Sequence, residues 1–182
     1  MRKGTHGTCA SRAESIVQNG FSLSSVGLRG TGIYFWGYSD MSLKAKAANL
    51  ALCWHAFAQK RGDYSKDTDQ SAAVIFAVIH VEGDELLDLE SDLIRDKFEA
   101  FVLSISEKHP DLGTDTAESI SKTYDIFIDL LEKKMGAPFK AIHVRVQPPK
   151  TYKGGLSKNY TGNPSCYVVK DQQVIDVEGC EV

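Results

Sequence analysis

The segment GTHGTCASRAESIVQNGF, residues 4–21, contains a strand pattern and the helix pattern that follows it. A short strand is predicted over about residues 2–6. A helix is predicted from Ser11 to Gln18. Gly20 marks the end of this helix, because glycine readily takes the left-handed conformation found after many helices. This strand-to-helix change is the first unit of the fold.

Further strands and helices follow at irregular intervals. The run AVIFAVIHV, residues 73–81, is apolar and β-branched, as in a strand buried on both faces. In AIHVRV, residues 141–146, buried and exposed types alternate as in a half-buried strand. The other predicted elements are strands at 33–36 and within CYVVKDQQVIDV (166–177, a terminal strand or hairpin), and helices at about 41–59, 91–107 and 115–135. Helices placed between short, separated strands favour an α+β fold over a doubly wound α/β fold.

The composition is that of an ordinary globular domain. The chain has 182 residues, 42% of them hydrophobic and 25% charged, and one domain over residues 1–182 is expected. No segment reaches the about 18 apolar residues of a membrane span, and MRKGTHGT, residues 1–8, lacks the apolar run of a signal peptide. A cytoplasmic protein without a membrane partner is therefore expected. The cysteines lack zinc-site and disulfide-framework spacing, so reduced thiols and no metal are expected. They are Cys9, Cys53, Cys166 and Cys180.

Charge is distributed unevenly along the chain. Residues 82–96 contain seven acids and one arginine. Residues 140–170 contain no acid and six lysines or arginines. The second segment predicts a cationic surface, which could hold the phosphates of a nucleic acid.

Two short motifs lie at an informative spacing. HGT, residues 6–8, precedes the first helix, and GTGIYF, residues 30–35, contains a tyrosine eight residues before a serine. Together they resemble the catalytic core of the ADP-ribosyltransferases of the diphtheria-toxin and poly(ADP-ribose) polymerase type. CYVVKDQQVI, residues 166–175, is similar to the final catalytic strand of that family. The resemblance implies a split antiparallel β-sheet core with helices and a site that binds NAD as substrate. The residues that match NAD-binding positions are His6, Gly7, Thr8, Gly32, Tyr34 and Ser42.

The resemblance also implies a role for each of these residues. His6 would hydrogen-bond the adenosine ribose, and the Gly7 backbone would pair with the nicotinamide carboxamide. Tyr34 would stack on the nicotinamide ring, and Ser42 would offer its hydroxyl to the carboxamide. The implied reaction cleaves the nicotinamide–ribose bond through an oxocarbenium-like state, and an acceptor attacks the anomeric carbon.

Two positions depart from the family pattern. Ala45 stands where the polymerases carry a second stacking tyrosine, and Cys166 stands where the family has its catalytic glutamate. These departures argue against chain elongation. They favour mono-ADP-ribosyl transfer, with His6, Tyr34 and Cys166 at the three catalytic positions. If the thiol merely replaces a carboxylate, Cys166→Glu is expected to raise NAD cleavage.

The acceptor and the biological setting are less constrained by the residues. The acceptor is a protein, or a nucleic acid bound by the basic segment 140–170. A toxin or effector, with an inhibitory antitoxin as partner, is the expected setting. A catalytically inactive module that binds NAD or ADP-ribose is the alternative.

Other interpretations of single residues remain open from the sequence. His6 could be a strand-end histidine with a structural hydrogen bond. Cys166 and His143 could form a nucleophile pair if their strands are neighbours. Glu178 and Glu181 could supply the missing carboxylate.

Overall fold

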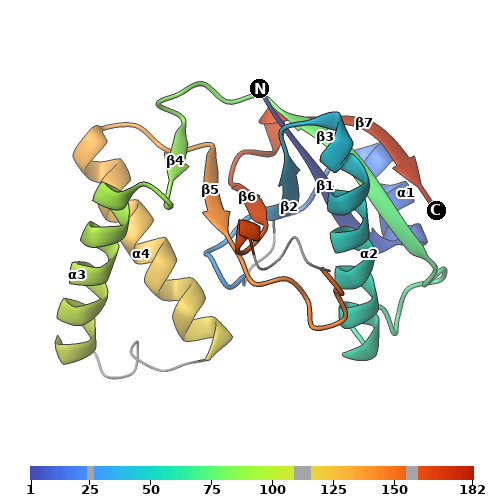
Figure 1. Ribbon diagram of the computed structural model, residues 1–182, viewed down its shortest axis with the longest axis horizontal. Coiled ribbons are helices and arrows are strands. Elements are labelled where there is room, and N and C mark those ends of the chain that lie inside the picture. Colours follow the sequence, from blue (N-terminus) through green and yellow to red (C-terminus); the bar gives the residue numbers. More distant parts are fainter. Residues whose placement is uncertain (24–26, 109–115, 155–159) are drawn as a thin grey trace.

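The computed structural model describes residues 1–23, 27–108, 116–154 and 160–182. Within these residues the fold is α+β, as predicted, with four α-helices and a mixed seven-stranded sheet (Figure 1). The strands are β1 (Arg2–Cys9), β2 (Ile33–Tyr38), β3 (Ala72–Ile79), β4 (Leu86–Asp88), β5 (Ala141–Arg145), β6 (Ser165–Val169) and β7 (Ile175–Glu181). The helices are α1 (Ala10–Asn19), α2 (Lys44–Lys60), α3 (Asp92–Lys108) and α4 (Ala117–Met135), with short 3-10 turns η1 (Met41–Leu43) and η2 (Gln172–Val174).

Helix ends follow local sequence signals. The Gly20 N–H donates to the carbonyl of Ile16 at 2.8 Å, so the predicted end of α1 is confirmed. Helix α4 begins after Thr116, whose hydroxyl accepts from the Ser119 N–H at 3.2 Å. It ends at Gly136, which has the left-handed conformation (φ 75°) of a C-terminal cap.

The strand order in the sheet is β4-β5-β6-β2-β1-β3-β7. Each neighbouring pair is antiparallel except β4–β5, which is parallel. The sheet is therefore mixed, whereas the resemblance implied an antiparallel sheet. Strands β6 and β7 do not form the predicted terminal hairpin. The η2 turn separates them, and three strands lie between them in the sheet. Strand β7 instead pairs with the edge of β3 that β1 leaves free.

The sheet opens between its two central strands. Pairing of β1 with β2 covers Lys3–Thr5 and Trp36–Tyr38. Beyond Thr5, β1 continues to pair with β3 as far as Cys9, while the first residues of β2 pair with β6. The two strands therefore diverge from His6 onward, although both belong to the same seven-stranded sheet.

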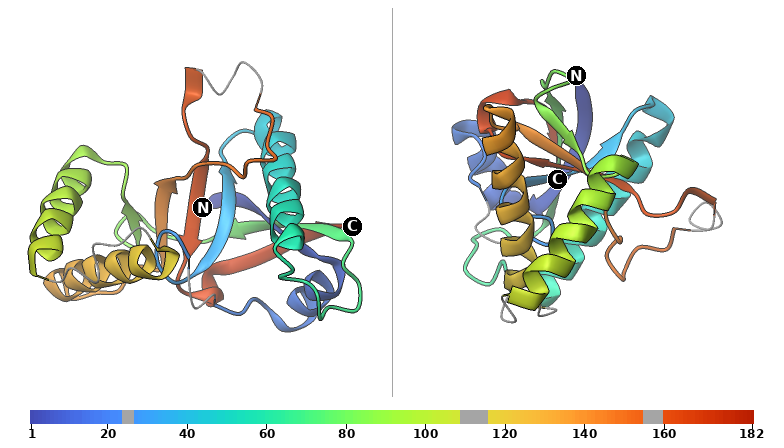
Figure 2. Two further views of the ribbon diagram at one scale, coloured as in Figure 1. Left: turned by 90° about the horizontal axis from the view of Figure 1, so that it is seen from below. Right: turned by 90° about the vertical axis from the view of Figure 1, so that its left-hand side faces the viewer.

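Apolar side chains fill both faces of the sheet. On one face, Phe21, Phe35, Ile75 and neighbours form a cluster that includes Ala13 of α1. The opposite face carries two clusters, one under α2 and one under α4. Helices α3 and α4 lie beside β4 and β5, and α2 lies beside β1 and β3 (Figures 1 and 2). None of the described helices has the length and apolar character needed to span a membrane.

Candidate functional site

His6 lies at the point where β1 and β2 diverge. Its imidazole is partly buried against Phe21 and Phe35, with ring centroids 5.2 and 5.8 Å away. The ring Nδ1 is 2.9 Å from the carbonyl oxygen of Tyr34. A carbonyl can only accept, so Nδ1 carries the proton and donates. Burial lowers the pKa of His6, and the hydrogen bond to Tyr34 partly offsets this. The neutral ring thus keeps a lone pair on Nε2.

The side chain of Tyr34 lies on the other face of the sheet. Adjacent strand residues point to opposite faces, and the Tyr34 ring packs on the α4 cluster whereas Phe35 packs beside His6. The Tyr34 hydroxyl donates to the carbonyl of Gly30 at 2.6 Å and accepts from the Arg29 N–H at 3.0 Å. Burial raises the pKa of Tyr34, so the phenol stays protonated. Tyr34 therefore fixes the loop that precedes its own strand.

Helix α4 fixes the same loop from a second side. The Thr31 N–H and hydroxyl both donate to the carboxylate of Asp125, each at 2.9 Å. A side chain at position 30 would collide with this carboxylate, because a Cβ on Gly30 would lie 2.8 Å from Asp125 Oδ1. Gly32 packs directly on β6, where a Cβ would lie 2.6 Å from the Val168 side chain. Sequence reasoning missed Asp125, since nothing local links it to a loop 94 residues away.

Gly7 and Thr8 continue β1 past the opening. A Cβ on Gly7 would lie 2.0 Å from the carbonyl oxygen of Ala51, so α2 packs directly on this glycine. Helix packing by itself thus explains the absence of a side chain at Gly7. Thr8 is 3% exposed and lies in the same strand.

Ser42 lies away from the opening. It is exposed in the η1 turn, where its N–H donates to Asp40 Oδ1 at 2.7 Å. Helix α2 begins at Lys44, and Ala51, which touches Gly7, comes two turns later, about 10 Å along the axis. The structure therefore brings His6 to the backbone of Tyr34, but the side chains of His6 and Tyr34 lie on opposite faces of the sheet, and Ser42 lies apart from both.

Cys166 is a core residue in this structure. Its side chain is 2% exposed, lies opposite Trp36 and Val144 in register, and belongs to the α4 cluster. Burial raises the pKa of the thiol to about 12, so it is protonated at neutral pH. The hypothesis that Cys166 and His143 form a nucleophile pair is wrong. His143 pairs in register with Tyr167, the next residue along β6, and so its side chain lies on the opposite face from Cys166.

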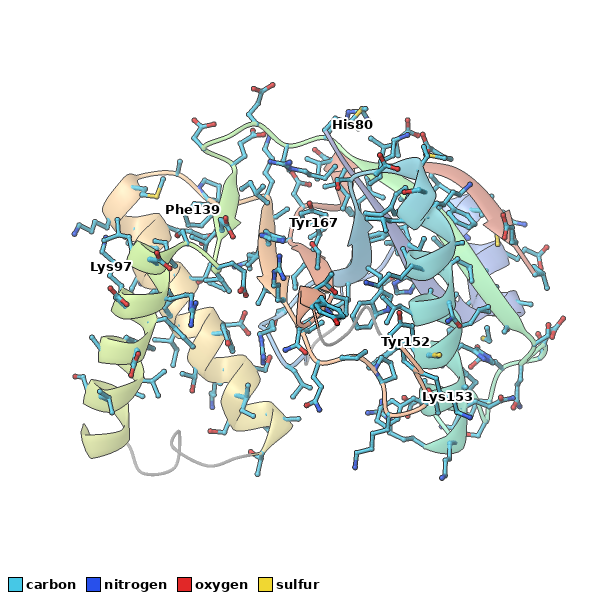
Figure 3. All side chains as sticks on the ribbon, in the orientation of Figure 1. His80, Lys97, Phe139, Tyr152, Lys153 and Tyr167 are labelled. Carbon is cyan, nitrogen blue, oxygen red and sulfur yellow. The ribbon has the colours of Figure 1, made fainter. Side chains whose placement is uncertain are left out.

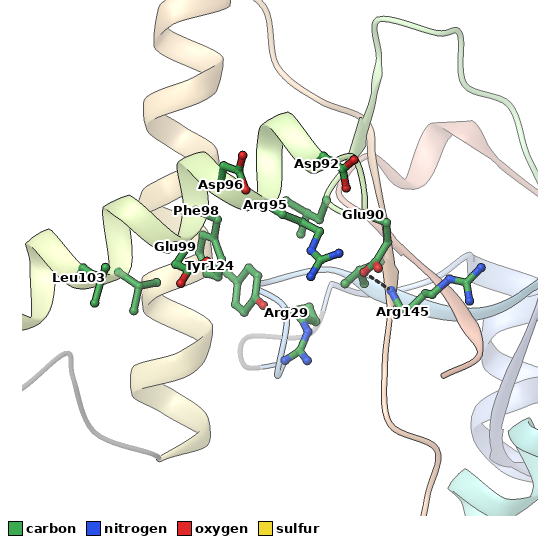
Figure 4. Close-up of a pocket in the computed structure, with 13 residues that line it drawn as sticks. Arg29, Glu90, Asp92, Arg95, Asp96, Phe98, Glu99, Leu103, Tyr124 and Arg145 are labelled. Carbon is green, nitrogen blue, oxygen red and sulfur yellow. Dashed lines mark hydrogen bonds between the residues drawn. The ribbon is translucent and has the colours of Figure 1, made fainter. Parts of the chain in front are cut away.

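A pocket of about 750 Å³ adjoins the loop held by Tyr34 (Figure 4). Arg29 and Arg95 point into it beside the Tyr124 ring, and the Arg29 guanidinium lies 5.2 Å from that ring. The Arg29 Nε is buried without a hydrogen-bond partner among the described atoms. Acidic side chains line the same pocket: Glu90, Asp92, Asp96 and Glu99. Its size suits a nucleotide-sized ligand. No local pattern in the sequence singled out Arg29.

The basic segment 140–170 is less cationic than predicted. Lys140 forms an ion pair with Glu85, and Lys170 Nζ lies 3.7 Å from Glu132. Lys158 falls outside the described residues. Tyr152 and Lys153 lie beside α2 (Figure 3), where the Thr151 hydroxyl donates to the carbonyl of Cys53 at 3.1 Å.

The two glutamates that could have replaced the missing carboxylate lie far from Cys166 in the sheet. Glu178 and Glu181 lie in β7, at the far edge of the sheet from β6, with β2, β1 and β3 between the two strands. Among the described residues, no group of three or more His, Cys, Asp or Glu is arranged to hold a metal ion. No family model, curated protein or solved structure matches the chain.

Proposed function

We propose that the chain is an NAD-dependent mono-ADP-ribosyltransferase. The observation that carries the proposal is the hydrogen bond from His6 to the Tyr34 carbonyl at the opening between β1 and β2. Strands β1, β2 and β6, which hold the three positions matched by the sequence motifs, are also direct neighbours in the sheet. Motifs that are far apart in the sequence thus lie on adjacent strands.

The state of His6 suits a sugar ligand. Because Nδ1 donates to the Tyr34 carbonyl, Nε2 of the neutral ring can accept a hydrogen bond from a ribose hydroxyl. His6 would then bind the adenosine ribose of NAD where β1 and β2 diverge.

The pocket beside Arg29 would bind the phosphates of NAD and supply the charged groups of the reaction. The Arg29 guanidinium lines this pocket and is a donor suited to a phosphate oxygen of NAD. Cys166 supplies no negative charge, so the carboxylate that stabilises the oxocarbenium-like state would come from the acceptor or from the acids of the pocket, such as Glu90. This arrangement favours single transfer over chain elongation.

The test is nicotinamide release from labelled NAD. The wild-type chain should release nicotinamide in the presence of protein or nucleic-acid acceptors, and His6→Ala and Tyr34→Ala should lose both release and NAD binding. His80→Ala is the matched control, since the His80 side chain is 56% exposed at the end of β3. Unchanged NAD affinity in both site variants would contradict the family assignment.

The burial of Cys166 favours one alternative, an inactive module that binds NAD or ADP-ribose. NAD binding that depends on His6, without nicotinamide release on any acceptor, would support it. If the acceptor is a nucleic acid held by Lys150 and Lys153, labelling should fall steeply as salt rises. Labelling that is independent of salt would exclude this acceptor.

A further inference from the structure

Three polar side chains from adjacent strands form a hydrogen-bonded chain beside the pocket that Arg29, Glu90 and Arg145 line. His143 Nδ1 lies 2.8 Å from Asp88 Oδ1, and His143 Nε2 lies 2.9 Å from Ser165 Oγ. Asp88 ends β4, His143 lies in β5, and Ser165 begins β6. The Asp88 side chain is 53% exposed and that of His143 is 22% exposed, so solvent reaches the group.

The direction of the hydrogen bonds follows from the acceptors. The Asp88 carboxylate only accepts, so the neutral imidazole carries its proton on Nδ1. Nε2 then accepts the proton of the Ser165 hydroxyl. Asp88 is itself held in place, because its Oδ1 also accepts from the Glu90 N–H at 3.0 Å. This is the order of an orienting carboxylate, a general base and a nucleophile.

The sheet fixes the positions of all three side chains. Asp88 lies opposite His143 in the parallel β4–β5 pair, and Ser165 lies diagonal to His143 in the antiparallel β5–β6 pair. Side chains held by paired strands are positioned more rigidly than side chains on loops.

The Gly37 backbone packs on one side of Ser165, and a positive charge lies on the other side. Gly37 borders the hydroxyl, and a Cβ there would lie 2.9 Å from Ser165 Oγ. Arg145 lies directly opposite Ser165 in register, and its Nη1 donates to the carbonyl of Thr161 at 2.9 Å. The other guanidinium N–H groups can face an oxyanion or an acidic group of a substrate.

We propose that Asp88, His143 and Ser165 form a nucleophilic acyl-transfer site for small carboxylic esters that carry a negative charge. Ser165 Oγ attacks the ester carbonyl while its proton passes to His143 Nε2. The alcohol then leaves with that proton, and an acyl-serine ester remains. Water attacks this ester with His143 again as base, which releases the carboxylic acid and restores the serine.

The direct test is covalent labelling with a fluorophosphonate, in which Ser165 Oγ bonds to phosphorus and fluoride leaves. Mass spectrometry of the full chain should locate the label on Ser165. Ser165→Ala should abolish it, and His143→Gln should slow it by about 100-fold or more because the general base is lost. Asp88→Asn should slow it as well. Ser104→Ala, at an exposed serine of α3, should label like the wild type.

A second measurement separates catalysis from a merely structural role. The wild type should hydrolyse mono-p-nitrophenyl succinate faster than p-nitrophenyl acetate, and Arg145→Gln should reduce this preference. Circular dichroism checks that each variant is folded. A wild-type chain without label on Ser165, or a folded His143→Gln variant that labels at the wild-type rate, would overturn the proposal. Both readouts are independent of NAD, so they stand apart from the test of ADP-ribosyl transfer.

Discussion

At the scale of single residues, Cys166 is governed by packing. Its thiol is 2% exposed, and Val168 of the same strand face is fully buried. A glutamate at this position would place a carboxyl group in the apolar cluster under α4, where it would lose its hydration.

We therefore expect Cys166→Glu to destabilise the protein rather than to raise NAD cleavage, contrary to the expectation from sequence. The free energy of unfolding should fall by about 3 kcal/mol or more. Cys166→Ala, which removes one heavy atom and adds no polar group, should cost less, about 0.5–1.5 kcal/mol. Urea denaturation of the three proteins measures both values. A stable Cys166→Glu variant with faster nicotinamide release would contradict the placement of this strand.

His6 gives a prediction on pH dependence. Burial lowers the pKa of His6 in the folded protein. The unfolded chain therefore binds more protons once the pH falls below about 6.5, and the folded state loses stability in that window. His6→Gln removes this titration, so its free energy of unfolding should fall less between about pH 7 and the folded-state pKa. The difference can reach about 1.4 kcal/mol per pH unit. Denaturation curves at several pH values measure the free energy of unfolding of both proteins. If this free energy falls equally in the wild type and in His6→Gln as the pH is lowered, the prediction is wrong.

At the scale of elements, the loop before β2 depends on helix α4. The Asp125 carboxylate accepts two hydrogen bonds from Thr31, one from its N–H and one from its hydroxyl. This contact joins the Tyr34 side of the opening to the pocket beside Arg29.

Asp125→Ala is expected to lower the free energy of unfolding by about 1–3 kcal/mol, because both donors of Thr31 lose their acceptor. If the pocket holds NAD, this variant should also weaken NAD binding. Asp129→Ala, at an exposed position one turn later on α4, is the matched control and should change stability by less than about 0.5 kcal/mol. Thermal denaturation and NAD titration of both variants check the prediction, and equal effects would refute the role of Asp125.

At the scale of the whole molecule, β7 completes the sheet from the far end of the chain. It pairs with β3, and Ile175 and Val177 pack on the cluster that contains Phe35. Strand β3 would otherwise be an open edge of buried residues.

Removal of residues 175–182 should lower the free energy of unfolding by about 3 kcal/mol or more. The truncated chain loses the ladder hydrogen bonds of β7 and the packing of Ile175 and Val177 on the core. It should also promote aggregation through the open edge of β3. Removal of Val182 alone, which is 82% exposed, should have little effect. Urea denaturation and light scattering measure the two consequences, and a monomeric, equally stable truncated chain would contradict this role of β7.

The sequence by itself determined the α+β class, the approximate helices and strands, and the helix ends at Gly20 and Gly136. These depend on neighbours a few residues away, through side-chain periodicity and backbone conformation. Only the tertiary structure decided that β6 and β7 lie apart, that the Cys166 thiol faces the core, and that Asp88, His143 and Ser165 meet. Strand order places such partners together across tens of residues, and local periodicity carries no information on which strands become neighbours.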